Sequence, residues 1–397
     1  MPVTPCINEA LPEEVLGVIF EEHAKLEWRA PVIDGLVCQQ WRRTALRSPR
    51  AWAHLDICEK FQSAPSELRQ QWLGRSGTVP LHIQVSCHWR LEETLDQHHE
   101  RIESLTVRYD LARLLLEKRS FPILQSLTIN DRNIIDHVFR WTTWDAMPAL
   151  RSLRAGHILV DTLPSKAFPA LRVLALSKVN EYDHVIQNSY HSLTTLMLER
   201  LYVPDSSETL VFSSLRFLSL FAVKNLKHRM CVPALTTYHE GDITEEQSFS
   251  MPLPLLTEYG IYQIHKPPLF NVTRLDQCCP NLSRFSVRTR TSSVIKSFLH
   301  SLSGQPSALP MLRILAVGLR EYSREDKDSM INDVFVRNMA TSVKMELCFD
   351  GKLRVPLYFG SVRAYIEEGR RKLTSALRMR IDPFEYLSFV LGFVLSL

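Results

Sequence analysis

The sequence predicts a mixed α/β chain in which a three-helix unit precedes an irregular solenoid of parallel strands. Apolar residues recur at helical spacing near the start, and a leucine pattern recurs every 20 to 30 residues farther along. Hydrophobic residues make up 45% and charged residues 23% of the 397 residues, which is typical of a folded chain. We therefore expect a tail (1–9), a helical unit (10–57), a linker helix (58–78), a solenoid (79–320) and a C-terminal capping region (321–397).

The helical unit opens with Leu11 and Pro12, which are followed by Glu13 and Glu14. Proline in the first turn and carboxylates near the positive end of the helix dipole are typical of a helix start. Apolar residues at 15, 16, 19 and 20 then form a broad stripe on that helix. A second helix is expected over 32–46 and a short third piece after Pro49. Helices this small bury little surface alone, so we expect a partner or neighbouring domain to cover them.

The strings LPEEVLGVIF, GLVCQQWRRTAL and SPRAWAHLDI resemble an F-box over roughly Ala10 to Ile57. That family uses its three helices to dock onto the Skp adaptor of SCF-type (Skp, cullin, F-box) ubiquitin ligases. One departure is that the family's leucine near the end of the first helix is here His23 or Ala24. The alternative for any single residue, Trp41 and Trp52 above all, is that it packs the small core. The resemblance implies an adaptor-binding face made of Leu11, Pro12, Val15, Leu16, Ile19, Phe20, Val37, Cys38 and Trp41.

The segment after the helical unit predicts a connecting helix and a first strand. Pro65 to Arg75 is typical of a short helix that ends at a glycine. Leu81, Ile83 and Val85 alternate with polar residues, which predicts a strand with one buried face. The run QQWLGRSGTVPLHIQV also resembles, less specifically, the stretch that follows the F-box in many fungal F-box proteins.

From about residue 100 to 320 a motif recurs, as in FPALRVLAL and LPMLRILAV. It resembles leucine-rich repeats, in which each copy gives one parallel strand and a return segment. An ordinary α/β sheet is the alternative, but the gaps between copies are short and polar for the helices that it needs. We expect Leu153, Leu174, Leu196, Leu218 and Tyr238 to stack inside. The first aliphatic residues of the copies are Ile102, Leu124, Leu150, Leu171, Leu193, Leu215, Leu235, Leu256, Leu282 and Leu312.

One position departs from leucine-rich repeats and predicts an irregular arc. The Asn or Cys that usually follows the last leucine of a copy is replaced by an apolar residue, which is expected to point inward. The polar backbone atoms of the turn must then find other partners. The residues concerned are Ile158, Val179, Leu201, Val223, Ile243 and Ile264.

The side chains next to the inward leucines are expected on the concave face, because side chains alternate along a strand. Aromatic and arginine side chains are the usual anchors of protein interfaces. The alternative is that a long loop or the C-terminal segment covers this face. The candidate substrate-binding residues are Arg154, Phe217, Phe221, His239, Tyr262, Arg284 and Arg288.

Several classes of partner and chemistry find no support in the sequence. The 47 basic and 43 acidic residues give a net charge of +4, without the basic face of a nucleic-acid binder. The eight cysteines form no CxxC pair, which indicates reduced thiols and no metal site. The apolar run from Tyr386 to Leu397 is too short to span a membrane. Because no phosphate loop or nucleophile motif is present either, we expect no cofactor, no membrane contact and no catalysis.

The resemblance to an F-box, together with the repeat pattern, implies a substrate-recognition subunit of an SCF-type ubiquitin ligase, located in the cytoplasm, the nucleus or both. Its partners would be a Skp adaptor, a cullin bound through that adaptor, and a protein substrate that the sequence does not name. The alternative is a non-catalytic repeat scaffold or receptor that binds the adaptor without delivering a substrate.

Overall fold

The computed structural model divides into two compact units, unit 1 (Met1–Val203) and unit 2 (Pro204–Leu397), each described by itself. The structure describes residues 11–57, 66–85, 97–108, 112, 119–130, 138–139, 147–156, 159–160, 170–177, 186, 189–200, 209–223, 226, 230–241, 252–264, 272–289, 309–319, 344–349 and 353–357.

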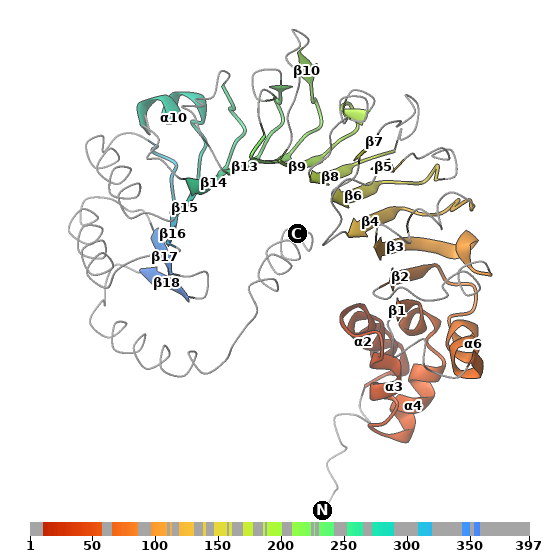
Figure 1. Ribbon diagram of the computed structural model, residues 1–397. Coiled ribbons are helices and arrows are strands. Elements are labelled where there is room, and N and C mark those ends of the chain that lie inside the picture. The colour runs from red at the N-terminus through yellow and green to blue at the C-terminus, as the bar shows by residue number, and fades with distance from the viewer. Residues whose placement is uncertain are drawn as a thin grey trace, which may run out of the picture. The chain divides into compact units, whose positions relative to one another are not determined.

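Unit 1 begins with helices α2 (Glu13–Leu26), α3 (Ala30–Asp34) and α4 (Gln39–Leu46) and the 3-10 turn η1 (Pro49–Trp52) (Figure 1). Helix α2 starts directly after Pro12, as predicted. The prediction of one helix over 32–46 was wrong, because the chain leaves the helical conformation between α3 and α4. Cys38 is extended, and its sulfur accepts a hydrogen bond from the Trp41 backbone N–H at 3.5 Å. Cys38 therefore caps the start of α4 instead of continuing a helix.

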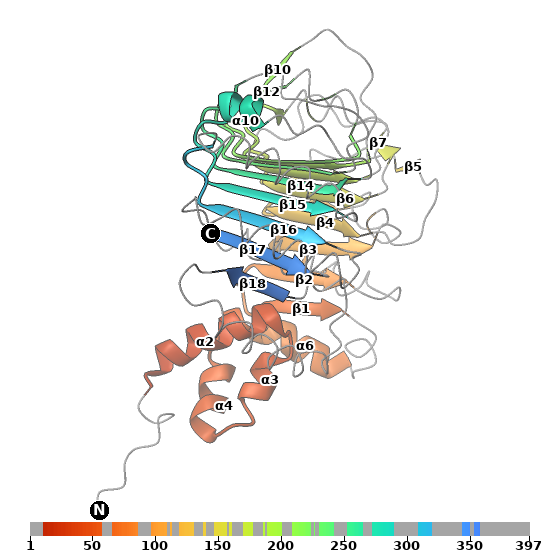
Figure 2. The ribbon, with the colours of Figure 1, turned by 90° about the vertical axis from the view of Figure 1, so that its left-hand side faces the viewer.

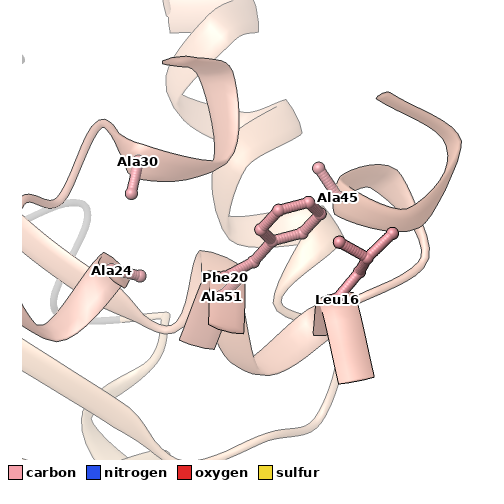
Figure 3. Close-up of a cluster of buried hydrophobic side chains, with 6 residues drawn as sticks. All are labelled: Leu16, Phe20, Ala24, Ala30, Ala45 and Ala51. Atoms are coloured by element: carbon pink, nitrogen blue, oxygen red, sulfur yellow. The ribbon is translucent and has the colours of Figure 1, made fainter. Parts of the chain in front are cut away.

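The three helices enclose a small core built around an aromatic ring. Leu16 and Phe20 have no exposed surface, and Figure 3 shows them among small alanine side chains from the neighbouring elements. Phe20 contacts Trp41, with ring centroids 5.2 Å apart. The Trp52 indole N–H donates a hydrogen bond to the Ala45 carbonyl at 2.7 Å, which ties η1 to α4. The other members of the core are Ala24, Ala30, Ala45 and Ala51.

A cluster of tryptophans joins the predicted connecting helix, α6 (Ser66–Arg75), to the helical unit. The Trp72 ring lies between Trp28, at 5.2 Å, and Trp52, at 4.7 Å between centroids. The Arg75 guanidinium lies over the Trp52 ring at 4.6 Å, a cation–π contact. The helices therefore form one packed body with the segment that leads into the sheet.

The sheet of unit 1 is parallel, and its strands follow chain order, as Figure 2 shows. Leu127, Leu153, Leu174 and Leu196 are paired side by side across four strands, and all are buried. Two short strands, β5 (Val138–Phe139) and β7 (Leu159–Val160), pair separately. The main strands are β1 (His54–Ile57), β2 (Leu81–Val85), β3 (Ile102–Arg108, after the 3-10 turn η2, His99–Arg101), β4 (Ser126–Asn130), β6 (Ser152–Gly156), β8 (Val173–Ser177) and β9 (Thr195–Glu199).

Unit 2 repeats this arrangement with aromatic residues in its interior. Leu218, Tyr238, Tyr259, Phe285 and Leu315 are paired in register and buried. Strands β10 (Leu210–Val211) and β12 (Met230–Cys231) form a separate pair, and helix α10 (Val272–Cys278) precedes β15. The main strands are β11 (Phe217–Phe221), β13 (Thr237–Gly241), β14 (Glu258–Ile264), β15 (Arg284–Thr289), β16 (Ile314–Leu319), β17 (Lys344–Phe349) and β18 (Leu353–Leu357).

The predicted parallel-strand solenoid is confirmed. All ten residues that mark the repeat starts, from Ile102 to Leu312, are buried, and so are the residues predicted to stack inside. The parallel pairing continues past the predicted boundary at 320, because β17 pairs in parallel with β16. Strand β18 then pairs antiparallel with β17. The rest of the predicted capping region, including the apolar run 386–397, lies outside the described residues.

The strand ends show how the turns are made. Arg200 and Ala222 directly follow β9 and β11 and have φ values of 54° and 51°, in the left-handed region that non-glycine residues rarely adopt. The Ala222 N–H donates to the Gly241 carbonyl at 3.0 Å, which satisfies one turn donor. Val223 was predicted to point inward and is half-buried. The side chains of Ile158, Val179, Leu201, Ile243 and Ile264, for which the same was predicted, lie outside those described.

Two histidines stack on the first strands of unit 1. Their surroundings predict that the folded chain loses stability at acidic pH. The His54 and His82 rings are parallel within 7° at 4.5 Å. Burial, and then the neighbouring histidine, lowers the pKa of His54 to about 4, and burial lowers that of His82 against the opposing charge of Glu103. The unfolded chain therefore binds more protons than the folded chain between about pH 6.5 and pH 4, so stability should fall as pH falls through that window.

The measurement is the urea midpoint of unfolding as a function of pH. It should decrease from pH 7 to pH 5, and the decrease should be smaller in His54→Gln, which removes one titrating ring. His191→Gln changes an exposed histidine outside this pair and is the control. An identical pH slope in wild type and His54→Gln would contradict this assignment.

Candidate functional site

The helical unit exposes an unusual number of large apolar side chains. Nine of the thirteen exposed large hydrophobic residues among the described residues lie between 15 and 46. Leu26 and Leu36 are the most exposed, at 88% and 81%. We call these nine residues the apolar helical surface: Val15, Val18, Ile19, Leu26, Val32, Ile33, Leu36, Val37 and Leu46.

The structure divides the predicted adaptor-binding residues into two groups. Pro12, Val15, Ile19, Val37 and Cys38 are exposed, whereas Leu11 and Trp41 are half-buried and pack against the helical core.

The predicted adaptor face must be corrected at Leu16 and Phe20. Both are core residues with no exposed surface that a partner could contact. With Ala24 they are spaced four residues apart, so they lie on the side of α2 that meets α4 and η1. The sequence analysis missed Val18, Leu26 and Leu36. For Val18 and Leu26 the signal is that apolar residues occupy more than one stripe of α2, and one stripe suffices for the core.

The departure from the F-box pattern near the end of α2 has a structural explanation. The His23 Nδ1 lies 3.1 Å from Oδ1 of Asp34, a buried carboxylate on α3. Burial raises the pKa of the Asp34 carboxyl, and the hydrogen bond with His23 opposes that shift. In place of an apolar contact, a polar pair therefore joins α2 to α3.

The charged residues beside the helices tie α2 to α4. Arg43 donates a hydrogen bond to Oε1 of Glu13, and the Arg47 guanidinium lies 3.7 Å from Oε2 of the same carboxylate. All three side chains are partly exposed, so these pairs contribute little stability. They do fix the side-chain positions around Glu13.

In unit 2, three predicted substrate-binding residues form an aromatic cluster on the strand face opposite the buried ladder. His239 makes edge-to-face contacts with Phe217 at 5.3 Å and with Tyr262 at 5.4 Å between centroids. Gly260 lies beneath this cluster, because a Cβ there would lie 2.8 Å from Cδ2 of His239 and 2.9 Å from Oγ of Ser286. Any larger residue at 260 would displace the cluster.

A carboxylate beside the aromatic cluster is already paired. Oε1 of Glu258 lies 3.7 Å from Nε2 of His239 and 3.6 Å from Nε of Arg284. His239 lowers the pKa of Glu258; burial opposes that shift, and the charge of Arg284 adds to it. The three groups therefore balance one another and leave mainly aromatic surface for a partner.

The remaining candidate residues are Phe221 on β11, Arg288 on β15 and Arg154 on β6. The Phe221 ring covers Gly241, where a Cβ would overlap it. Arg288 pairs with Tyr262 in the backbone register of β14 and β15, and its side chain is outside those described. Arg154 belongs to β6 of unit 1.

A buried carboxylate replaces an inward leucine in unit 2, a feature that the sequence analysis missed. Glu240 is 4% exposed and accepts hydrogen bonds from the Tyr238 hydroxyl at 2.8 Å and from the Tyr259 hydroxyl. The two tyrosine rings stack at 5.4 Å. Burial and the negative charge of Glu240 raise the pKa of both phenols well above the usual value. The sequence signal for this carboxylate was that Tyr238, His239 and Glu240 occupy the position where other repeats have Leu-x-Leu.

Comparisons with known proteins identify no family for this chain. No family model matches the chain, and no curated protein matches it. Among solved structures, the crystal structure of a TLR13–ssRNA13 complex is similar to 69% of this chain, with 13% sequence identity and a TM-score of 0.39. The chain spans 39% of the length of that protein.

Neither a membrane-spanning helix nor a metal site is found among the described residues. No described helix combines the length and hydropathy required to cross a membrane. In the same part of the chain, histidine, cysteine, aspartate and glutamate side chains form no group of three or more that would hold a metal ion.

Proposed function

We propose that this chain is a substrate-recognition subunit of an SCF-type cullin ubiquitin ligase. In this proposal the apolar helical surface binds a Skp adaptor, and the strand faces of the solenoid hold a target protein. One observation carries it: a segment that resembles an F-box in sequence folds into three small helices and leaves nine large apolar side chains exposed.

The exposed apolar side chains support a protein partner on energetic grounds. Soluble proteins rarely expose a large apolar area unless it is an interaction site. Burying one leucine, isoleucine or valine side chain contributes about 1.5 to 3 kcal/mol. Leu36 and Val37 lie in the loop that breaks the predicted second helix, where they contribute nothing to the core. A partner that covers them therefore supplies the burial that the helical unit lacks.

The proposed mechanism needs no chemistry from this chain. A target bound to the solenoid and an enzyme bound through the adaptor and cullin would be held in one assembly. Tethering converts an encounter in solution into an intramolecular step with a high effective concentration. The transfer of ubiquitin to a target lysine would then be carried out by the other subunits.

The test is affinity purification of the full chain from a eukaryotic lysate, followed by ubiquitin transfer with the purified assembly. Co-purification of a Skp adaptor and a cullin, with ubiquitin transferred to a co-purifying protein, would support the proposal. Adaptor binding without transfer to any bound protein would favour the alternative, a non-catalytic scaffold or receptor. Failure to retain any Skp adaptor would refute both.

A further inference from the structure

Arg154 is a half-buried cation with no anionic partner among the described residues. It lies on β6 between Leu153 and Ala155, whose side chains are buried, so its own side chain is on the opposite face of the sheet. Burial lowers the pKa of its guanidinium, and no charge among the described residues contributes to that shift. A desolvated charge without a partner is unfavourable in a folded protein.

Two other partly buried arginines have polar or charged neighbours among the described residues. Arg101 donates to the Val79 carbonyl at 2.8 Å and to Oγ of Ser76 at 2.9 Å, which ties the start of β3 to the segment before β2. Arg284 lies 3.6 Å from the Glu258 carboxylate. Within the described part of the chain, the fold therefore supplies partners for these guanidinium groups but not for that of Arg154.

On β4 and β6, the described side chains that flank Arg154 offer hydroxyl groups and no carboxylate. Thr128 on β4 is paired with Arg154 in register, and Ser126 is paired with Ser152. On the other side, Ala175 of β8 is the register partner and offers only a methyl group. Two strands away from β6, Glu199 on β9 accepts a hydrogen bond from the Ser177 hydroxyl at 3.3 Å. The described side chains on this face of β4, β6 and β8, which lie side by side in Figure 1, are Ser126, Thr128, Ser152, Arg154, Val173, Ala175 and Ser177.

This combination fits a carboxylate. A guanidinium presents paired N–H donors that match the two oxygens of a carboxylate, and neighbouring hydroxyls can donate to the same group. One positive charge balances one carboxylate, whereas phosphorylated residues are commonly held by clusters of arginines. The described positions on this face of β4, β6 and β8 supply one arginine.

We propose that this face of unit 1 binds an aspartate or glutamate side chain of an extended protein segment, with Arg154 as its ion-pair partner. The inference rests on the proposed function in one respect, that the segment belongs to a captured target. The expected loss of one charged, hydrogen-bonded contact corresponds to about 10-fold to 100-fold in affinity.

The binding test uses the full chain and three fluorescein-labelled probes: a Ser-Glu repeat peptide, a Ser-Gln repeat peptide and a phosphoserine-Gln repeat peptide. Wild type should bind the Ser-Glu peptide about 10-fold or more tighter than the Ser-Gln peptide. Arg154→Met should remove that preference, and Arg154→Lys should recover part of it, because lysine keeps the charge but lacks the paired donors. Arg151→Gln, which removes an exposed arginine three residues away, should leave it unchanged.

The midpoint temperature of thermal unfolding is a second readout. If Arg154 stabilised the fold, replacing it would lower this midpoint, whereas an unpaired charge predicts that replacing it raises the midpoint. Methionine keeps the apolar stem and removes the unpaired charge, so Arg154→Met should unfold about 2 °C or more above wild type. A lower midpoint would overturn the proposal, since Arg154 would then stabilise the fold. Equal binding of the Ser-Glu and Ser-Gln peptides, an equal loss in Arg151→Gln, or a preference for the phosphoserine peptide would also overturn it.

Adaptor capture measured in parallel separates this inference from the proposed function. If Arg154→Met and wild type both retain a Skp adaptor but neither prefers the acidic peptide, the carboxylate site fails alone. If no adaptor is captured but the acidic peptide is bound through Arg154, the ubiquitin-ligase proposal fails and the carboxylate site stands.

Discussion

The double variant Ile19→Asp, Leu36→Asp should lose capture of a Skp adaptor and remain folded. Both side chains are exposed, at 44% and 81%, so aspartate at these positions meets water in the free chain. In the proposed complex the same carboxylates would be desolvated without partners, at a cost of about several kcal/mol. The measurement is adaptor pulldown, with circular dichroism to show that the helices persist.

A matched control distinguishes an interface effect from a general one. Leu255→Asp makes the same change at an apolar residue of unit 2 that is 52% exposed, and it should leave adaptor capture intact. Leu16→Asp is unsuitable as an interface test, because it would place a charge in the helical core and unfold the unit. Full capture by the folded double variant would show that the adaptor does not use the apolar helical surface.

Glu240→Leu should destabilise the chain, although it restores the leucine that the repeat pattern calls for. The change leaves the Tyr238 and Tyr259 hydroxyls without the carboxylate that now accepts their hydrogen bonds. Each buried hydroxyl that loses its acceptor costs about 1 to 3 kcal/mol, so the two together predict a loss of about 2 to 6 kcal/mol. The measurement is the urea-dependent free energy of unfolding.

The triple variant Glu240→Leu, Tyr238→Phe, Tyr259→Phe tests the cause of that loss. Removing both hydroxyls together with their acceptor leaves an apolar interior, so the triple variant should be more stable than Glu240→Leu alone. Tyr190→Phe, at a half-buried tyrosine in unit 1, controls for hydroxyl removal as such. If the triple variant is the less stable of the two, the hydroxyl–carboxylate contacts do not account for the effect.

The sequence predicted the repeat interior well because its signal is redundant. A leucine, or at Ile102 an isoleucine, marks the same structural position at all ten repeat starts, and each of these residues is buried. Tyr238 was identified as an inward residue from the same register. The role of Glu240 was missed, because the pattern fixes which side chains point inward but not how a polar side chain there finds its partners.

The candidate site was predicted less completely, for two physical reasons. Helical periodicity shows that α2 is apolar on more than one stripe, but it does not say which stripe faces the core, so Leu16 and Phe20 were assigned to the surface. The break before α4 depends on the extended backbone of Cys38, which is a local conformation that no spacing of apolar residues encodes. The environment of Arg154 depends on strand pairing between repeats, which requires the register as well as the pattern.

The tryptophan cluster around Trp72 affects the distance between the helical unit and a target bound to the first repeats. Because Trp28, Trp52 and Trp72 pack α6 against the helices, and the His82 N–H donates to the Ala53 carbonyl at 2.9 Å, the first repeats are braced against the helical unit. A rigid connection, unlike a flexible linker, holds a bound target at one distance from the helical unit. In the proposed assembly, a target held by unit 1 would therefore present its lysines at fixed distances from the adaptor-binding helices. Only the lysines at the distance that the ubiquitin-carrying enzyme reaches would be modified quickly.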